Sequence, residues 1–85
     1  MEIGQAITVG AVFGGKIKIK PVWFIWQERE YRIRDITYIW NRREGNSLCY
    51  LFSVTDTADN LYELSYQTDT ATWHLLACAE DTWRR

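Results

Sequence analysis

The nearest match to a chemical motif in this chain is GAVFGGKI, residues 10–17. It has the G-x-x-x-x-G-K spacing of a phosphate-binding loop, in which backbone amides and a lysine hold nucleotide phosphates. Ile17 stands where a Ser or Thr hydroxyl should bind magnesium. The following IKIK alternates as a strand does and stops at Pro21, whereas the loop should open a helix. We therefore interpret the match as accidental and expect no nucleotide hydrolysis.

The other side chains suited to catalysis or metal binding are few and scattered. His74 is the single histidine, and Cys49 and Cys78 lie in separate apolar stretches. A nucleophile needs a base and an orienting group nearby, and structural zinc needs four ligands, usually in close pairs. Three carboxylates fall in turn sequences, where Asp hydrogen-bonds to nearby backbone: Asp56, Asp59 and Asp69. We therefore predict no enzyme activity, no cofactor and no metal site.

A binding surface is the remaining candidate. If the chain is extended here, Lys16, Lys18 and Lys20 share one face of their segment. Basic groups beside stacking aromatics are how small barrels hold single-stranded nucleic acid. The candidate binding residues are Trp23, Ile25, Arg32, Arg34, Lys18 and Lys20. The alternative is a solvated strand face, in which nearby carboxylates offset the basic groups and edge lysines prevent aggregation.

The apolar run VWFIW, residues 22–26, favours a protein contact more strongly than nucleic acid. A barrel wall with one wet side needs fewer apolar residues, so one face of this run is expected to be covered by residues 1–13, a second copy or another protein. Aromatic anchors are enriched in interface hot spots. Trp23 is the best interface candidate. We assign the other large aromatics of this region to the core: Phe24, Trp26, Tyr31 and Trp40.

The size of the chain explains why it needs many aromatics. Its 85 residues are expected to form one domain, 1–85, and a domain this small buries only about 60–65% of its unfolded surface. Five Trp, five Tyr and three Phe supply the large side chains that such a core needs.

The net charge is only −1, which marks no general affinity for nucleic acid or membranes. The first 50 residues nevertheless carry eight Lys and Arg against five Asp and Glu. Neither end has an apolar run long enough for an export signal or a membrane span. We therefore expect a cytoplasmic protein with reduced thiols.

Strand-like alternation recurs along most of the chain, interrupted by turn sequences. The expected strand segments are 16–26, 31–40, 48–54 and 61–66, and the turns are 27–30, 41–46 and 56–60. Within 31–40 the apolar positions change parity. A β-bulge near Arg34–Asp35 would bring both halves to the core face.

The two ends of the chain are less determined. Residues 73–78 alternate as a strand would, but residues 71–83 also contain good helix formers after a Thr that could cap a helix. In residues 1–13 the glycines leave open whether a strand forms. We predict an all-β fold, an antiparallel meander closing into a small SH3-like, partly open barrel of five to six strands. The alternative is an α+β fold with a C-terminal helix over 71–83.

The pattern P-x-x-F-x-W-x-x-R-x-Y-x-I-x-x-I-x-x-x-W, which starts at Pro21 and ends at Trp40, resembles the opening of a small bacterial domain family of uncharacterised function. The similarity extends over residues 20–78, with Glu28 where that family has a turn glycine. The resemblance implies the β fold and no catalytic residues. The expected function is a non-catalytic interaction module, self-associating or binding a protein partner, with single-stranded nucleic acid as the alternative and no membrane partner.

Overall fold

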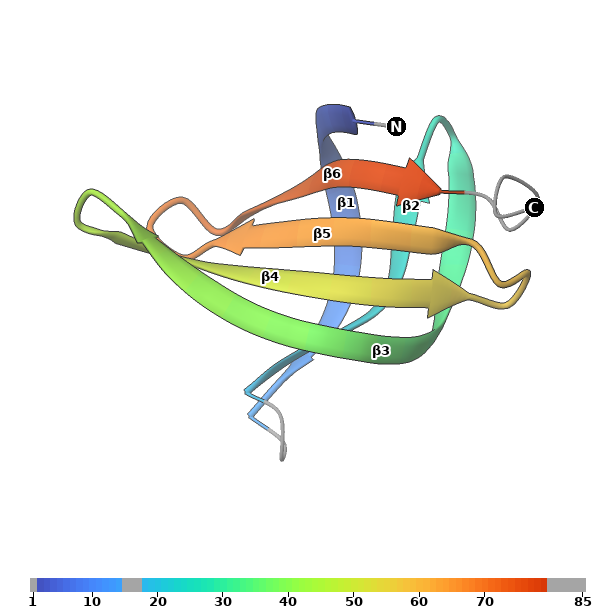
Figure 1. Ribbon diagram of the computed structural model, residues 1–85, viewed down its shortest axis with the longest axis horizontal. Coiled ribbons are helices and arrows are strands. Elements are labelled where there is room, and N and C mark those ends of the chain that lie inside the picture. Colours follow the sequence, from blue (N-terminus) through green and yellow to red (C-terminus); the bar gives the residue numbers. More distant parts are fainter. Residues whose placement is uncertain (1, 15–17, 80–85) are drawn as a thin grey trace.

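The computed structural model describes residues 2–14 and 18–79, which form six strands and no helix (Figure 1). The strands are β1 (Glu2–Phe13), β2 (Ile19–Trp26), β3 (Arg29–Glu44), β4 (Ser47–Asp56), β5 (Leu61–Gln67) and β6 (Thr72–Ala79). Each pairs antiparallel with the next, and β6 pairs with β1, so the sheet is a closed barrel. The predicted all-β meander is confirmed, with the ring closed rather than partly open.

The alternative helix over residues 71–83 is wrong for the part that is described, because Thr72–Ala79 is a strand. Trp73 and Leu75 alternate into the core and are 8% and 0% exposed. The residues that favour a helix adopt a strand here because β5 and β1 lie on either side of β6 and supply hydrogen-bond partners for its backbone.

Strand β1 serves both ends of the sheet because two glycines let it bend. Residues 2–7 pair with β6, whereas residues 8–13 pair with β2. Gly4 has a φ of +66° and lies within one register shift, and Gly10 borders another. In the sequence these glycines left it undecided whether residues 1–13 form a strand. In the structure they mark the bends by which β1 closes the barrel.

Strand β3 also divides between two neighbours. Its first four residues pair with β2, and the remainder pairs with β4. A register shift between Ile33 and Asp35 confirms the predicted β-bulge. A second shift, between Ile36 and Tyr38, was not predicted, and it reverses the alternation again.

The second bulge turns Tyr38 and Trp40 outward. Tyr38 pairs with Ser53, which lies between the core residues Phe52 and Val54 and therefore on the opposite face of β4. Tyr38 is 63% exposed, and its ring lies 5.1 Å from that of Trp40. The prediction that Trp40 belongs to the core is wrong, because the extra residue at the bulge moves it to the outer face.

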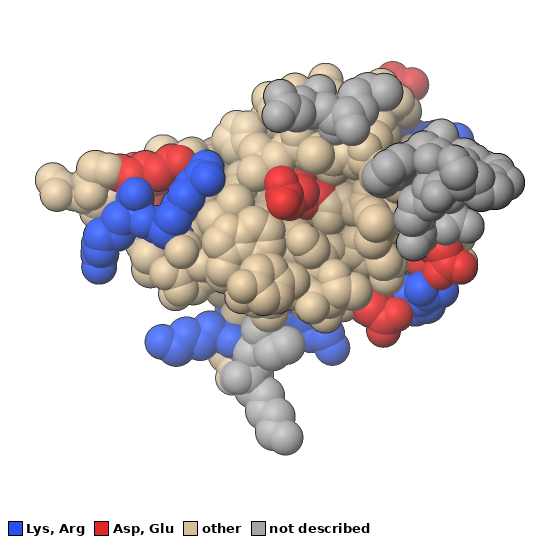
Figure 2. Space-filling model, in the orientation of Figure 1, with Lys and Arg blue, Asp and Glu red and all other residues tan. Residues whose placement is uncertain are grey.

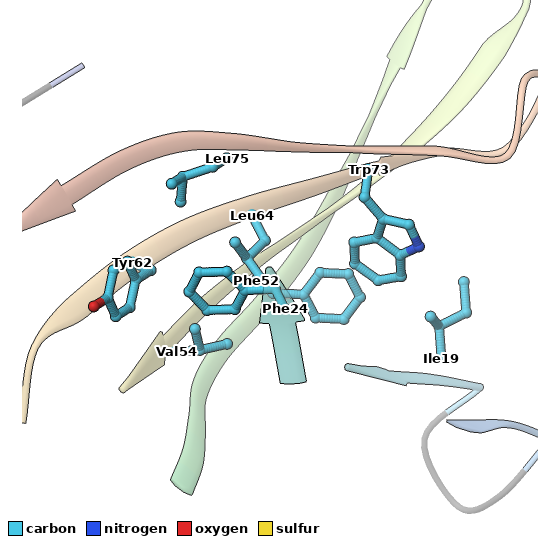
Figure 3. Close-up of a cluster of buried hydrophobic side chains, with 8 residues drawn as sticks. All are labelled: Ile19, Phe24, Phe52, Val54, Tyr62, Leu64, Trp73 and Leu75. Carbon is cyan, nitrogen blue, oxygen red and sulfur yellow. The ribbon is translucent and has the colours of Figure 1, made fainter. Parts of the chain in front are cut away.

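Alternate residues of four strands fill the barrel (Figure 3). The buried cluster comprises Ile19, Phe24, Phe52, Val54, Tyr62, Leu64, Trp73 and Leu75. As predicted, Phe24 is in the core and has no exposed surface. Trp26 and Tyr31 are half-buried and pack against the cluster, so they form its edge rather than its centre.

Candidate functional site

Most of the residues predicted to bind a partner lie on the outer surface of β2 and its neighbours. Phe24 is fully buried, so Trp23 and Ile25 on either side of it point outward. Arg32 is the cross-strand partner of Trp23. We call this surface the β2 face, and its members are Val12, Lys20, Trp23, Ile25 and Arg32.

Trp23 is half-buried although it points outward, because its indole lies against Gly10 of β1. A Cβ atom at Gly10 would overlap the indole ring. The glycine therefore leaves the space that the ring occupies. The ring covers β1 instead of projecting from the surface.

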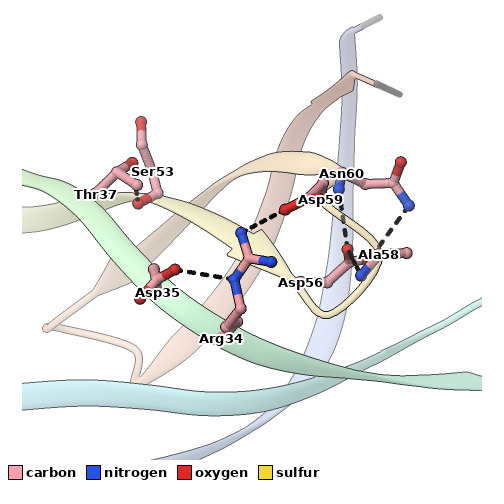
Figure 4. Close-up of polar contacts among 8 residues, drawn as sticks. All are labelled: Arg34, Asp35, Thr37, Ser53, Asp56, Ala58, Asp59 and Asn60. Carbon is pink, nitrogen blue, oxygen red and sulfur yellow. Dashed lines mark hydrogen bonds and ion pairs between the residues drawn. The ribbon is translucent and has the colours of Figure 1, made fainter. Parts of the chain in front are cut away.

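Arg34 does not join the other basic residues. Its Nη2 lies 2.5 Å from Asp59 Oδ1 in the β4–β5 turn, and its Nε donates to Asp35 Oδ2 at 3.0 Å (Figure 4). Hydrogen bonds to Asp59 and then Asp35 raise the pKa of the guanidinium. Its charge is therefore neutralised locally.

The basic residues singled out in the sequence, which we call the basic stripe, are Lys16, Lys18, Lys20, Arg32 and Arg34. Fewer of them than expected form a common surface. Lys20 is exposed on the β2 face, and Lys18 is exposed just before β2. Lys16 lies outside the described residues. Arg32 Nε is 4.0 Å from Glu30 Oε2, and both side chains are more than half exposed, so this ion pair contributes little. Lys18, Lys20 and Arg32 are what remains of the stripe.

A second outer surface, on β3 to β6, was not anticipated. One cross-strand row runs from Trp40 through Leu51 and Ser65 to His74. Leu51 and Ser65 are only 2% and 4% exposed although neither belongs to the core cluster. We call this surface the sheet face, and its members are Tyr38, Trp40, Leu51, Ser53, Glu63, Ser65 and His74.

The sheet face carries almost no charge. Figure 2 looks onto this side of the barrel and shows uncharged atoms over most of it, with one acidic group near the middle. Glu63 is the one Asp, Glu, Lys or Arg in the set that defines the face. The spacing of Tyr38 and Trp40 placed the two rings on one face, but only the second bulge decides that this face is the outer one.

A pocket of about 750 Å³ opens at the end of the barrel, between the β2–β3 hairpin, the β4–β5 turn and the end of β6. We call it the end pocket. It is lined by Trp26, Gln27, Arg29, Glu30, Tyr31, Arg32, Asp56, Thr57, Ala58, Asn60, Tyr62, Cys78 and Ala79. These residues come from three separate parts of the chain, 26–32, 56–62 and 78–79, so no local sequence pattern marks the pocket.

Asp56 organises one wall of the end pocket. Its Oδ1 accepts hydrogen bonds from the backbone amides of Ala58 and Asn60, at 2.8 and 3.0 Å (Figure 4). Its Oδ2 accepts from the Tyr62 hydroxyl at 2.8 Å and from Asn60 Nδ2 at 3.3 Å. Asp in this turn was predicted to bond to nearby backbone, and that is confirmed.

These bonds set the ionisation of the pair. Burial by itself would raise the pKa of the Asp56 carboxyl, but the hydrogen bonds from Asn60, Tyr62 and Ala58 outweigh burial and hold that pKa below its ordinary value. Burial, and then the bond to Asp56, raise the pKa of the Tyr62 hydroxyl. At neutral pH the pair is therefore a carboxylate that accepts from a neutral phenol.

The residues considered for catalysis lie apart from one another. His74 is half-buried on the sheet face, whereas Cys49 is buried, and burial followed by the nearby Glu44 raises the pKa of its thiol. Gly10 lies inside β1, and β2 stands where a phosphate-binding loop would need a helix.

Among the described residues no group of three His, Cys, Asp or Glu could hold a metal ion. No helix in this part of the chain is long and apolar enough to cross a membrane.

Comparison of the chain with models of protein families, with curated proteins and with solved structures found no match. The resemblance to a bacterial domain family therefore stays a prediction.

Proposed function

We propose that this barrel is a non-catalytic interaction module that self-associates through the sheet face. The observation that carries the proposal is an outer surface with almost no charge and with an aromatic pair, the exposed Tyr38 and the half-buried Trp40. Interfaces are depleted of charged residues at their centres and enriched in Tyr and Trp.

An uncharged surface is complementary to a second copy of itself. Burying it removes few ions from water, and an ion that is buried without a partner is costly. The β2 face suits self-association less well. In a two-fold contact between two β2 faces, Lys20 and Arg32 of both copies would be brought together, and like charges repel.

The test is sedimentation velocity of the full chain over a range of concentrations. We expect the wild type to dimerise and Tyr38→Glu to raise the dimer Kd at least ~10-fold, about 1.4 kcal/mol, because a carboxylate would be buried unpaired. Tyr38 is 63% exposed, so this substitution should leave the fold intact. A chain that stays monomeric at the highest attainable concentration would contradict the proposal.

Ile25→Glu is the matched control, because Ile25 is also an exposed apolar strand residue, 39% exposed, but lies on the β2 face. It should leave the dimer unchanged. If Ile25→Glu dissociates the dimer and Tyr38→Glu does not, the interface is the β2 face that the sequence suggested. Glu63→Gln should strengthen the dimer, since it removes the one acidic group of the sheet face.

Single-stranded nucleic acid is the second candidate, favoured by the direct pairing of Arg32 with Trp23 on the β2 face. Cations that follow the phosphates and a ring on which a base stacks are the elements of such sites. Titration of a labelled oligothymidylate at two salt concentrations tests it. We expect affinity to fall as salt rises, because phosphate neutralisation releases counterions.

The variant Arg32→Glu should weaken this binding. Arg43→Glu is the control and should not weaken it, because the substitution changes the net charge by the same amount but Arg43 lies near the other end of β3, away from the β2 face. Equal losses in both variants would mean that only the net charge of the chain matters. That result would remove the β2 face as a defined site.

A further inference from the structure

The end pocket has an aromatic wall with one ring face available. Tyr31 stacks on Phe24, with 5.1 Å between ring centroids and 14° between ring planes. One face of Tyr31 is thus covered from inside the barrel, and the residue also lines the pocket. Trp26 and Tyr62 flank it with tilted rings at 6.1 and 5.7 Å. A planar group in the pocket could stack on Tyr31 between these two rings.

Hydrogen bonds hold this wall in place. Trp26 Nε1 donates to Gln5 Oε1 of β1 at 2.8 Å, which orients the indole. The Tyr62 hydroxyl is held by Asp56. A site whose rings are already oriented loses less conformational entropy on binding.

Asp56 faces the pocket but is not available as a ligand for a cation. Each of its carboxylate oxygens already accepts two hydrogen bonds. A carboxylate offers about four lone-pair positions, so its acceptor capacity is used within the turn. Asp56 therefore shapes the pocket instead of binding what enters it.

The charged residues that β3 contributes to the pocket include one cation that makes no ion pair within the described part of the chain. The pocket is lined by Arg29, Glu30 and Arg32 of β3 in addition to Asp56. Glu30 lies 4.0 Å from Arg32 and partly balances it. Arg29 is exposed, and among the described residues it makes no ion pair within 4.0 Å. A guanidinium with five donors suits a carboxylate or phosphate group.

We propose that the end pocket binds a small molecule composed of a planar aromatic ring and an anionic group. The ring stacks on Tyr31 between Trp26 and Tyr62, and the anionic group meets Arg29 at the rim. The volume of about 750 Å³ lies in the usual range for small-molecule sites. The proposal does not depend on self-association, because the pocket and the sheet face share no residue.

The test follows the five indole N–H resonances of the full chain by NMR during titration with AMP and, separately, with indole-3-acetate. These probes carry a phosphate and a carboxylate on a planar ring, so they distinguish the two sources of the anionic group. The Trp26 resonance is assigned with Trp26→Phe. We expect a saturable shift of the Trp26 resonance with at least one probe. Adenosine supplies only the planar ring, and inorganic phosphate supplies only the anionic group. If AMP is the probe that binds, each of these two should bind at least ~10-fold more weakly than AMP, because losing one contact of about 1.4 kcal/mol weakens binding tenfold.

Arg29→Gln should weaken binding of the anionic probe at least ~10-fold, the low end of the range for a hydrogen bond to a charged group, and should leave adenosine binding unchanged. Arg43→Gln is the matched control and should change neither. The proposal is overturned if neither probe shifts Trp26, if Arg29→Gln has no effect, or if the Trp23 resonance responds in place of Trp26. The last result would place the ligand on the β2 face.

Discussion

Asp56 is the residue on which the end of the barrel depends. It is 4% exposed, accepts four hydrogen bonds and joins the β4–β5 turn to Tyr62 in the core. A buried carboxylate is stable only when its charge is satisfied in this way. The turn, the end pocket and part of the core edge therefore respond to one ionisation.

Asp56→Asn should lower the free energy of unfolding at pH 7 by about 2–3 kcal/mol, because an amide cannot accept all four bonds. The pKa of Asp56 is lowered in the folded protein, so its stabilisation is present above the unfolded pKa of about 4 and is lost as pH falls through the folded pKa. The difference between wild type and variant should thus shrink as the pH falls below about 4. Urea unfolding at several pH values measures it, and a difference independent of pH would contradict the assignment.

Gly10 and Trp23 form a second pair whose effect is local. Gly10→Ala should cost about 1–3 kcal/mol, as overpacking does, because the new methyl would displace the indole of Trp23. The matched control is the same substitution in a Trp23→Ala background. There Gly10→Ala should be neutral or stabilising, since alanine suits a strand interior better than glycine. Thermal unfolding of the four proteins completes the cycle, and equal losses in both backgrounds would contradict the contact.

At the level of elements, the β2–β3 hairpin contains the clearest backbone strain. Gln27 and Glu28, neither of them glycine, have φ angles of +54° and +64°. Two-residue hairpin turns with positive φ at both positions strongly prefer glycine or asparagine. The turn is therefore set by the pairing of β2 with β3 rather than by its own residues.

Glu28→Gly should raise the free energy of unfolding by about 1 kcal/mol, because it relieves a left-handed conformation that L-residues adopt at a cost. Glu30→Gly is the control, since Glu30 lies in extended β3, where glycine should destabilise. Chemical denaturation of both variants gives the signs. A destabilised Glu28→Gly protein would show that the Glu28 side chain contributes more than its backbone strain costs.

At the scale of the whole molecule, the barrel is closed by pairing of its first and last strands, β1 and β6. The β1–β6 ladder joins residues near position 5 to residues near position 75, whereas the β4–β5 ladder joins neighbours in the chain. Loop-closure entropy makes the distant contact the more costly one to form early. We expect β4 and β5 to pair first and the ring to close late in folding.

Stopped-flow kinetics of two core truncations test this order. Val54→Ala in β4 should mainly slow folding, and Ile7→Ala in the part of β1 that pairs with β6 should mainly speed unfolding. Both side chains pack in or against the core, so each should cost enough, above about 0.6 kcal/mol, for a reliable comparison. A folding rate lowered more by Ile7→Ala would mean that the barrel closes early.

The sequence by itself determined the features that depend on neighbouring residues. Alternation predicted the strands between residues 16 and 66 and the core position of Phe24, and the parity change predicted the bulge near Asp35. Turn chemistry placed Asp56 where it bonds to its own backbone. A period of two and a turn preference are local, so they can be read without knowing which strands lie side by side.

Only the tertiary structure decided what those elements expose. The second bulge moved Trp40 out of the core, Asp59 drew Arg34 away from the basic stripe, and Gly10 accommodated the ring of Trp23. The end pocket is assembled from three distant segments. Each of these outcomes depends on the register between strands, and contacts between residues far apart in the chain set that register. A shift of one residue sends every following side chain to the opposite face, so local patterns cannot decide it.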